Sequence, residues 1–186
     1  MAERTCLKGE DPMPSVLIIS DSHGLTDEVK EIKKKYESQV DGMIHCGDSE
    51  LNLHDKELEG FYYAKGNVDF DSEMEEEQAF TIDGVTFFVT HGHLFNIKST
   101  LMPLNYRAEE LGADVVCFGH SHMAGAEKVE NRLFINPGSC RQPRDHREPT
   151  YAILNWNDDL VFQLQYYNMK HMPIDLKLQT TLRSEA

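Results

Sequence analysis

Residues 16–23 read VLIISDSH, a short continuous apolar run that ends in aspartate, serine and histidine. Four consecutive aliphatic residues are typical of a β-strand that is buried on both faces. Apolar residues then recur at helical spacing between Leu25 and Tyr36, and a second short apolar run occupies residues 42–46. A strand, a helix and a strand in this order predict a parallel pair joined by a right-handed crossover.

The remaining chain predicts more strands than helices. Strands are expected at residues 61–64, 79–82, 85–90, 114–118, 124–129, 132–135, 151–156 and 160–167, and a second helix at about residues 99–111, with Gly112 as its end. Asp83-Gly84 between two apolar runs is a strong signal for a two-residue hairpin turn. Residues 173–182 alternate apolar and polar, which predicts a last strand, packed on the body or in a dimer contact. Parallel units followed by hairpins predict an α/β fold with two sheets packed face to face and helices outside.

Composition narrows the class of protein. The chain has 186 residues, 40% hydrophobic and 27% charged, an ordinary balance for one soluble globular domain. The net charge of −14 argues against a face that binds duplex nucleic acid or an anionic membrane, because both need clustered lysine and arginine. No stretch approaches the roughly 18 apolar residues of a membrane span. We expect a polar leader at residues 1–13 and a single domain at residues 14–186.

The cysteines indicate a reducing compartment. Cys6, Cys46, Cys117 and Cys140 match neither a paired metal knuckle nor a small disulfide framework. Three of them end or follow apolar runs, where cysteine usually acts as a small buried hydrophobe. A cytoplasmic location is therefore expected.

Polar side chains follow each of the predicted buried strands. In chain order they are Asp21 and His23, Asp48, Asn67, His91, and His120 with His122. Ligands bind at the carboxyl ends of strands in open α/β sheets. Each cluster alone is weak, because a Gly-Asp pair after a strand is more often a simple turn. Five clusters, all at strand ends, instead indicate one shared site.

Carboxylate and imidazole ligands together favour manganese, iron, nickel or zinc over a calcium site made only of oxygens. A closed structural zinc site is not expected, because no cysteine has ligand-like spacing at these strand ends. Two ions about 4 Å apart can share a carboxylate and a hydroxide, and the hydroxide then serves as the nucleophile.

The same blocks, in order, resemble the five blocks of the calcineurin-like metallophosphoesterase superfamily. The matching blocks are Asp21-x-His23, Gly47-Asp48, Gly66-Asn67, His91 and Gly119-His120-x-His122. The short length and the segments at 66–69 and 136–139 are similar to the small bacterial and archaeal phosphodiesterase branch, which also resembles the retromer scaffold subunit. The resemblance spans about residues 14 to 167. It implies a four-layer α/β/β/α sandwich of two mixed sheets flanked by helices.

The resemblance also implies the ligand set. One metal would be held by Asp21, His23, Asp48 and His122, and the other by Asp48, Asn67, His91 and His120, with Asp48 bridging. It implies two divalent ions, of which we expect manganese, with nickel, iron, zinc or magnesium as alternatives. The expected activity is hydrolysis of a small phosphodiester, or of a phosphomonoester, with Asp48, Asn67 and His91 as catalytic residues. The alternative function is a non-catalytic protein-binding scaffold of the same fold. The resemblance also implies a homodimer.

One departure concerns the general acid. Many superfamily members have histidine directly after the asparagine of the third block, where this chain has Val68. Candidates for the acid are His93, His54 and Asp69, on proximity to the motifs. Without a good acid, esters with an easily departing leaving group should be favoured.

Two arginines follow the Asn136-Pro137-Gly138-Ser139 segment. Arg141 and Arg144 are candidates for holding a phosphate oxygen, and the alternative is that both are solvated loop arginines. The segment itself predicts a structural turn, because proline fixes one angle, glycine supplies positive φ, and serine and asparagine cap the backbone.

Overall fold

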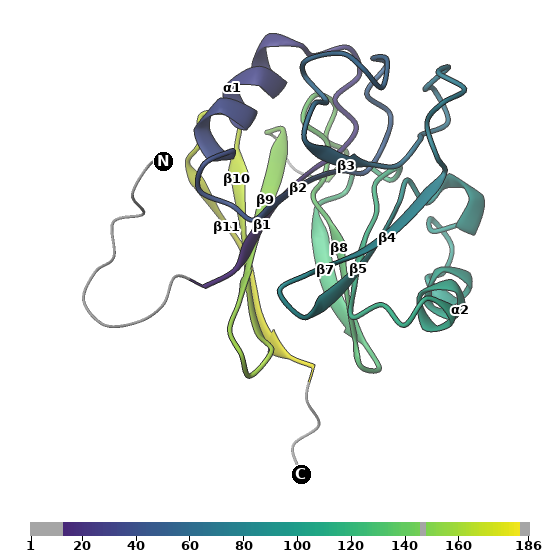
Figure 1. Ribbon diagram of the computed structural model, residues 1–186, viewed down its shortest axis with the longest axis vertical. Helices are drawn as coiled ribbons and strands as arrows, with labels where there is room; N and C mark the ends of the chain where they lie inside the picture. The colour runs from purple at the N-terminus through teal and green to yellow at the C-terminus, as the bar shows by residue number, and fades with distance from the viewer. Residues whose placement is uncertain (1–12, 146–147, 183–186) are drawn as a thin grey trace.

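The computed structural model describes residues 13–145 and 148–182, so the expected leader, apart from Met13, lies outside the described residues. Two mixed sheets form the body, in the strand orders β11-β10-β9-β1-β2-β3 and β4-β5-β6-β8-β7 (Figure 1). The first sheet consists of β1 (Ser15–Ile19), β2 (Gly42–His45), β3 (Phe61–Tyr63), β9 (Thr150–Trp156), β10 (Val161–Asn168) and β11 (Pro173–Thr181). The second consists of β4 (Glu77–Ile82), β5 (Val85–Thr90), β6 (Val115–Cys117), β7 (Gly125–Val129) and β8 (Arg132–Asn136). The helices are α1 (Asp27–Tyr36), the single-turn η1 (His93–Phe95) and α2 (Met102–Glu110).

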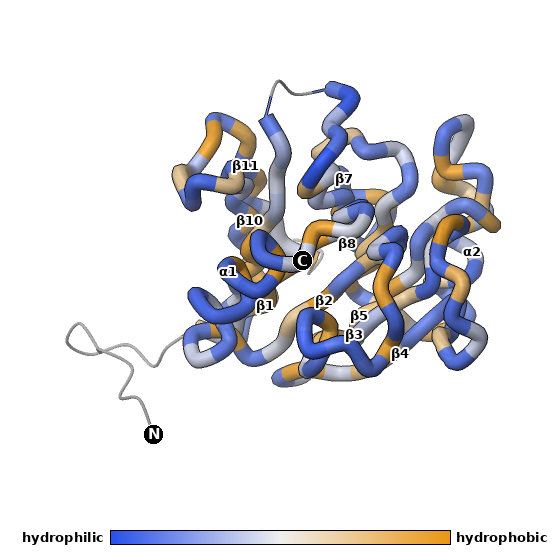
Figure 2. Tube along the Cα trace, turned by 90° about the horizontal axis from the view of Figure 1, so that it is seen from above, coloured by the Kyte–Doolittle hydropathy of each residue, from blue (hydrophilic) through white to orange (hydrophobic). Residues whose placement is uncertain are grey.

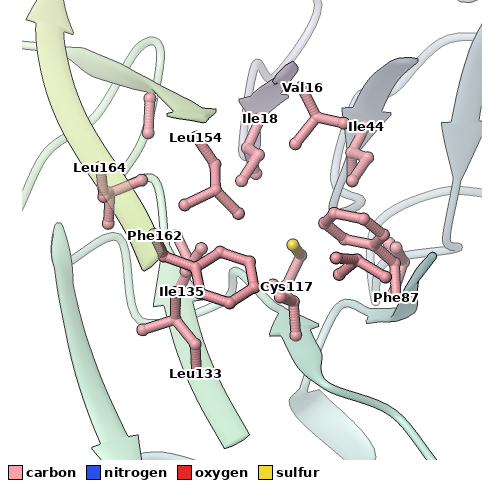
Figure 3. Close-up of a cluster of buried hydrophobic side chains, with 14 of the residues drawn as sticks. Val16, Ile18, Ile44, Phe87, Cys117, Leu133, Ile135, Leu154, Phe162 and Leu164 are labelled. Atoms are coloured by element: carbon pink, nitrogen blue, oxygen red, sulfur yellow. The ribbon is translucent and has the colours of Figure 1, made fainter. Parts of the chain in front are cut away.

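Three apolar clusters separate four layers, as predicted. The largest lies between the sheets, where Ile18 and Ile44 of the first sheet meet Phe87 of the second (Figure 3). A second cluster packs α1 on the outer face of the first sheet, and a third packs α2 on the outer face of the second. Figures 1 and 2 accordingly place the two helices on opposite sides of the pair of sheets. The order of layers is helix, sheet, sheet, helix.

The first sheet is built around β1, whose five residues are all buried. It pairs in parallel with β2, Val16 opposite Gly42, and antiparallel with β9. Because successive side chains of a strand point to opposite faces, Val16 and Ile18 enter the core between the sheets, while Leu17 and Ile19 pack against α1. The apolar run with no alternation is thus explained by burial on both faces.

The hairpin is confirmed, and the second helix is shorter than predicted. Asp83 and Gly84, both with positive φ, join β4 and β5. The helix begins at Met102, not Ser99, and has proline in its first turn. A helix that began at Ser99 would place Pro103 where an amide must donate to the Ser99 carbonyl, and proline has no such amide. Gly112, at φ 62°, follows the end of the helix as predicted.

The tail at 173–182 adds the edge strand β11, which pairs antiparallel with β10 of the same chain. Cys46, Cys117 and Cys140 are buried free thiols, and Cys6 lies outside the described residues. Neither α1 nor α2, the α-helices of the described residues, has the length and apolar character needed to cross a membrane.

Candidate metal centre

The polar clusters converge because the strands before them end at one edge. β1, β2 and β3 are mutually parallel, as are β5 and β6 in the other sheet. Backbone hydrogen bonds join the loops that follow, from Asp21 N–H to Gly47 O (3.0 Å) and from Gly119 N–H to His91 O (3.1 Å). The His91 ring connects the two sheets, since its Nδ1 bonds Cys46 O at 2.7 Å.

Four of the predicted ligands lie close together. Asp21, His23, Asp48 and His122 each offer an atom within 4.8 Å of those of the other three. His122 Nε2 lies 3.1 Å from Asp21 Oδ1 and 3.4 Å from His23 Nε2. All except His23 are buried. This geometry suits a divalent ion bound by two carboxylates and two imidazoles.

Three histidine rings bond through Nδ1 to groups outside the cluster, so that Nε2 of each ring points toward the cluster. Nδ1 of His122 bonds Gln142 O at 2.8 Å, and Nδ1 of His23 bonds the Glu50 carboxylate at 2.8 Å. His91 uses Nδ1 in the same way on a backbone carbonyl. Because Nδ1 must donate in each pair, the neutral ring presents the Nε2 lone pair to the cluster, the arrangement typical of metal-binding histidine.

The cluster therefore holds acceptors with no donors between them. His91 Nε2 faces Asp48 Oδ2 at 3.1 Å without an aligned hydrogen bond, and Asp21 Oδ1 is likewise buried and unpartnered. Buried polar atoms are normally paired, because an unpaired one costs roughly 1–3 kcal/mol. Facing lone pairs repel unless a proton or a cation lies between them. The donor set thus fits divalent metal.

The second predicted group lies beside the first. His91 contacts Asp48, which belongs to both predicted groups. The centroids of the His91 and His120 rings are 5.1 Å apart. Asn67 is exposed, and the residue after it contacts Asp48, since Val68 N–H donates to Asp48 Oδ1 at 3.0 Å. The structure therefore brings six of the seven predicted side chains into contact and places Asn67 in the adjoining turn.

Backbone strain marks these loops. Asp21, His23, Asp48, His120 and His122 all have positive φ, between 44° and 66°. Non-glycine residues rarely adopt this region, and such strain gathers at functional sites. Close packing also requires glycine, because a Cβ on Gly66 would lie 2.0 Å from Asp48 Oδ1.

Asp69 supports the Asp48 loop and is not placed to act as an acid. Its buried carboxylate accepts hydrogen bonds from the backbone amides of Asp48, Gly66 and Glu50 (each 2.8 Å), from the Ser49 hydroxyl and from the Tyr63 hydroxyl. Because five donors point at its two oxygens, the Asp69 carboxylate is kept deprotonated and has no proton to transfer.

The other two acid candidates differ in position. The ring of His93 lies 5.5 Å from that of His91 and 6.2 Å from that of His120, and its Nδ1 is buried without a partner. His54 is exposed and pairs with Glu73. Of the three candidates, His93 is the one in contact with the cluster.

The pKa values of the cluster residues are shifted in different directions. Burial raises the pKa of Asp48, but His91 and the Val68 amide outweigh it and lower the pKa to about 2. Asp21 raises the pKa of His122, whereas burial, aided by the neighbouring His91 and Lys98, lowers the pKa of His120 to about 4. Asp48 is therefore a carboxylate, and His120 a neutral base, at neutral pH.

The two arginines contact the site through the backbone. The Arg141 guanidinium donates to the His23 carbonyl, and the Arg144 amide donates to His122 O at 3.0 Å. Nearby, Ser139 Oγ donates to the Asp21 carbonyl at 2.8 Å, and Asn136 Nδ2 donates to Gly119 O at 3.0 Å. Residues 136–139 thus stabilise the loops that carry the predicted ligands, in agreement with the predicted structural turn.

Sequence reasoning missed the supporting residues. His45 is buried, and its pKa is lowered by burial to about 4, so it is neutral. Its Nδ1 accepts from Gly47 N–H at 3.1 Å, and its Nε2–H donates to the Ser22 hydroxyl at 2.9 Å, which ties the first two loops together. Glu50, which orients His23, has no motif of its own. Of these three residues, His45, Glu50 and Asp69, only Asp69 was identified from the sequence, and it was predicted there as a candidate acid.

Comparison with known proteins gives a consistent picture. Residues 15–159 match the model of the calcineurin-like phosphoesterase superfamily domain. The chain is 50% identical over 169 residues to the probable metallophosphoesterase YsnB of Bacillus subtilis, covering 90% of this chain and 99% of that protein. It is 31% identical over 145 residues to the phosphodiesterase MJ0936 of Methanocaldococcus jannaschii, covering 66% and 82%.

Solved structures agree in fold. A Streptococcus pneumoniae protein described as a predicted phosphoesterase superposes with a TM-score of 0.87 at 34% identity, covering 92% of this chain and 99% of that chain. Vacuolar protein sorting 29 from Cryptosporidium parvum superposes with a TM-score of 0.74 at 16% identity, covering 92% and 100%. The second likeness concerns the fold alone.

Proposed function

Because the chain belongs to the calcineurin-like phosphoesterase superfamily, we propose that it is a metal-dependent phosphodiesterase. The observation that carries the proposal is that two buried atoms, Asp21 Oδ1 and His91 Nε2, have no hydrogen-bond partner. Each faces another acceptor atom at 3.1 Å, which is His122 Nε2 for Asp21 and Asp48 Oδ2 for His91. Such a set binds cations and is unfavourable without them. A relative named as a phosphodiesterase supports the choice of substrate class.

The residues divide into two ligand groups. Asp21, His23, Asp48 and His122 would hold one divalent ion, and Asp48, Asn67, His91 and His120 the other. Two ions, when bound, would activate a water and neutralise the charge that develops on the phosphoryl oxygens. Asp48 is suited to both groups, because its two carboxylate oxygens face different neighbours, Oδ1 the Val68 amide and Oδ2 the His91 ring.

Protein groups around the cluster fix its geometry. The carbonyls of Cys46 and Gln142 and the carboxylate of Glu50 hold three imidazoles in one tautomer. Asp69 holds the Asp48 amide. A preorganised site does not have to reorient its dipoles as charge develops, which is the principal source of electrostatic catalysis.

Leaving-group protonation is the weak part of this site. Val68 supplies no proton, Asp69 is saturated, and His93 is the remaining candidate in contact with the cluster. We therefore expect a steep dependence of the rate on the acidity of the leaving alcohol.

The test measures hydrolysis of a chromogenic phosphodiester and the matching monoester by metal-stripped protein, with manganese, nickel, magnesium or zinc added back. We expect metal-dependent turnover that favours the diester and falls at least about 100-fold in Asp48→Asn. Asp175→Asn is the matched control, because Asp175 is exposed on β11, outside the cluster. Near-normal turnover in Asp48→Asn would disprove the shared role of this carboxylate.

A non-catalytic scaffold is the second candidate, because proteins of the vacuolar protein sorting 29 type share the fold. Folded protein that binds metal but hydrolyses neither ester with any of the four metals would favour it.

A further inference from the structure

A cavity of about 550 Å³ opens beside the candidate metal centre, on the outer face of the second sheet. Its lining includes Ser121, which stands between the predicted ligands His120 and His122. Ile97, Leu101, Phe118 and Phe134 form its apolar wall. A volume of this size is typical of a site for a small organic ligand.

Sheet geometry explains why the space is open. Phe134 faces the outer cluster, while its neighbours Leu133 and Ile135 face the core between the sheets. On β7, Ala126 packs toward the inner core, so Gly125 and Glu127 face outward with Phe134. Gly125 lies opposite Asn136 in the register, and a Cβ added to it would meet nothing within 4 Å. The missing side chain at Gly125 leaves the floor of the cavity uncovered.

Two cations line the same cavity. Lys98 and Arg144 are exposed, and neither forms an ion pair with a carboxylate of residues 13–145 or 148–182. Lys98 is close enough to His120, and Arg144 to His122, for their charges to act on those rings. These two cations outnumber Glu127, the one carboxylate among the described residues of the lining, so the entrance is locally positive in a chain of net charge −14. An apolar wall next to positive charge suits an anion that carries an apolar group.

We propose that this cavity binds the ring-bearing organic group of a phosphate ester whose phosphate lies at the metals, with Gly125 providing room for the ring. The proposal rests on the proposed function, since it assigns a substrate class to the same site. Phe118 and Phe134 offer aromatic surface, and the Glu127 carboxylate can accept hydrogen bonds from ring amino groups. Nucleoside phosphates have all of these features.

The experiment compares adenosine 5′-monophosphate with methyl phosphate, which share the phosphate and differ in the organic group. Binding of each to manganese-loaded protein is measured by isothermal titration calorimetry. We expect the nucleotide to bind at least tenfold more tightly than methyl phosphate. Gly125→Leu should reduce this ratio at least tenfold, because leucine occupies the floor. Lys128→Leu, the same side chain added to the exposed part of β7 outside the cavity lining, should keep the ratio of the wild type.

The ratio is taken within each variant, so a general loss of metal affinity cancels. Equal affinities for the two ligands in the wild type, or an unchanged ratio in Gly125→Leu, would overturn the proposal. Calorimetry needs no turnover, which separates the two hypotheses. A nucleotide preference in protein that hydrolyses no ester supports the cavity and counts against the enzyme, whereas hydrolysis of diesters with no preference counts against the cavity alone.

Discussion

The Asp69 carboxylate should contribute strongly to stability because it accepts five hydrogen bonds, and Asp69→Asn tests this. The change turns one oxygen into an amide that cannot accept a hydrogen bond. The less costly orientation places the amide at Oδ1, because Oδ2 has three donors, the amides of Asp48 and Gly66 and the Tyr63 hydroxyl. There the Glu50 amide loses its acceptor, while the Ser49 hydroxyl can rotate to accept.

The magnitude follows from the number of bonds. One lost bond to a charged group costs about 2 kcal/mol, and weakening the remaining bonds by removal of the charge adds about 1 kcal/mol. We therefore expect the free energy of unfolding to fall by roughly 3 kcal/mol. At about 2–4 °C per kcal/mol for a domain of this size, the melting temperature should fall by roughly 6–12 °C.

The assay is urea and thermal unfolding of metal-stripped protein, followed by circular dichroism. The matched control is Asp71→Asn, two positions along the same loop, where the carboxylate accepts from Leu53 and Glu73 amides but water can replace it. Its loss should be much smaller. An unfolding free energy for Asp69→Asn within about 1 kcal/mol of wild type would refute the hydrogen-bond reasoning.

The pH dependence gives a second check. Burial raises the pKa of Asp69, but hydrogen bonds from Tyr63, Gly66 and Glu50 outweigh it and lower the pKa below its ordinary value. A carboxylate with a lowered native pKa stabilises the fold fully above its unfolded pKa of about 3.9, and the contribution is lost as the pH falls through the native pKa. The difference in unfolding free energy between wild type and Asp69→Asn should be largest at neutral pH and shrink in acid.

Three further predictions concern the metal centre and the core. Gly66→Ala should lower manganese affinity, measured by calorimetry, at least about tenfold, because the added Cβ would lie 2.0 Å from Asp48 Oδ1. Unchanged affinity would mean that the loop adjusts freely. Metal affinity should rise from pH 6 to pH 8, with proton release on binding. Neighbouring carboxylates raise the pKa of His122, and they also raise the pKa of His91 although burial lowers it. Metal therefore competes with protons for these two rings. A metal affinity that does not change with pH would contradict this. In Cys6→Ser protein, iodoacetamide should label none of the three remaining cysteines before unfolding and all three afterwards, as measured by mass spectrometry. The reason is that burial raises the pKa of each remaining thiol, that of Cys140 to about 12. Rapid labelling of native protein would show that the core opens.

Patterns along the chain predicted most of the fold. The unbroken apolar run at 16–19 predicted a strand buried on both faces, and the Asp83-Gly84 pair predicted the hairpin. Such signals are local, so they survive without knowledge of the partners. The start of α2 was predicted three residues too early, because the apolar periodicity continued back through Leu101 while Pro103 fixed where helical hydrogen bonding could begin.

The sequence by itself determined which side chains follow the strands, because a polar block after an apolar run can be identified in one dimension. Only the tertiary structure decided what holds those side chains. Glu50, Asp69 and His45 act through hydrogen bonds to residues of other loops. The separations along the chain are between 19 and 27 positions for the pairs His23–Glu50, His45–Ser22, Asp69–Glu50 and Asp69–Asp48. The cavity beside the candidate metal centre likewise depends on Gly125 facing outward from a folded sheet. Contacts of this kind are set by which strands pair within a sheet, and no local spacing encodes them.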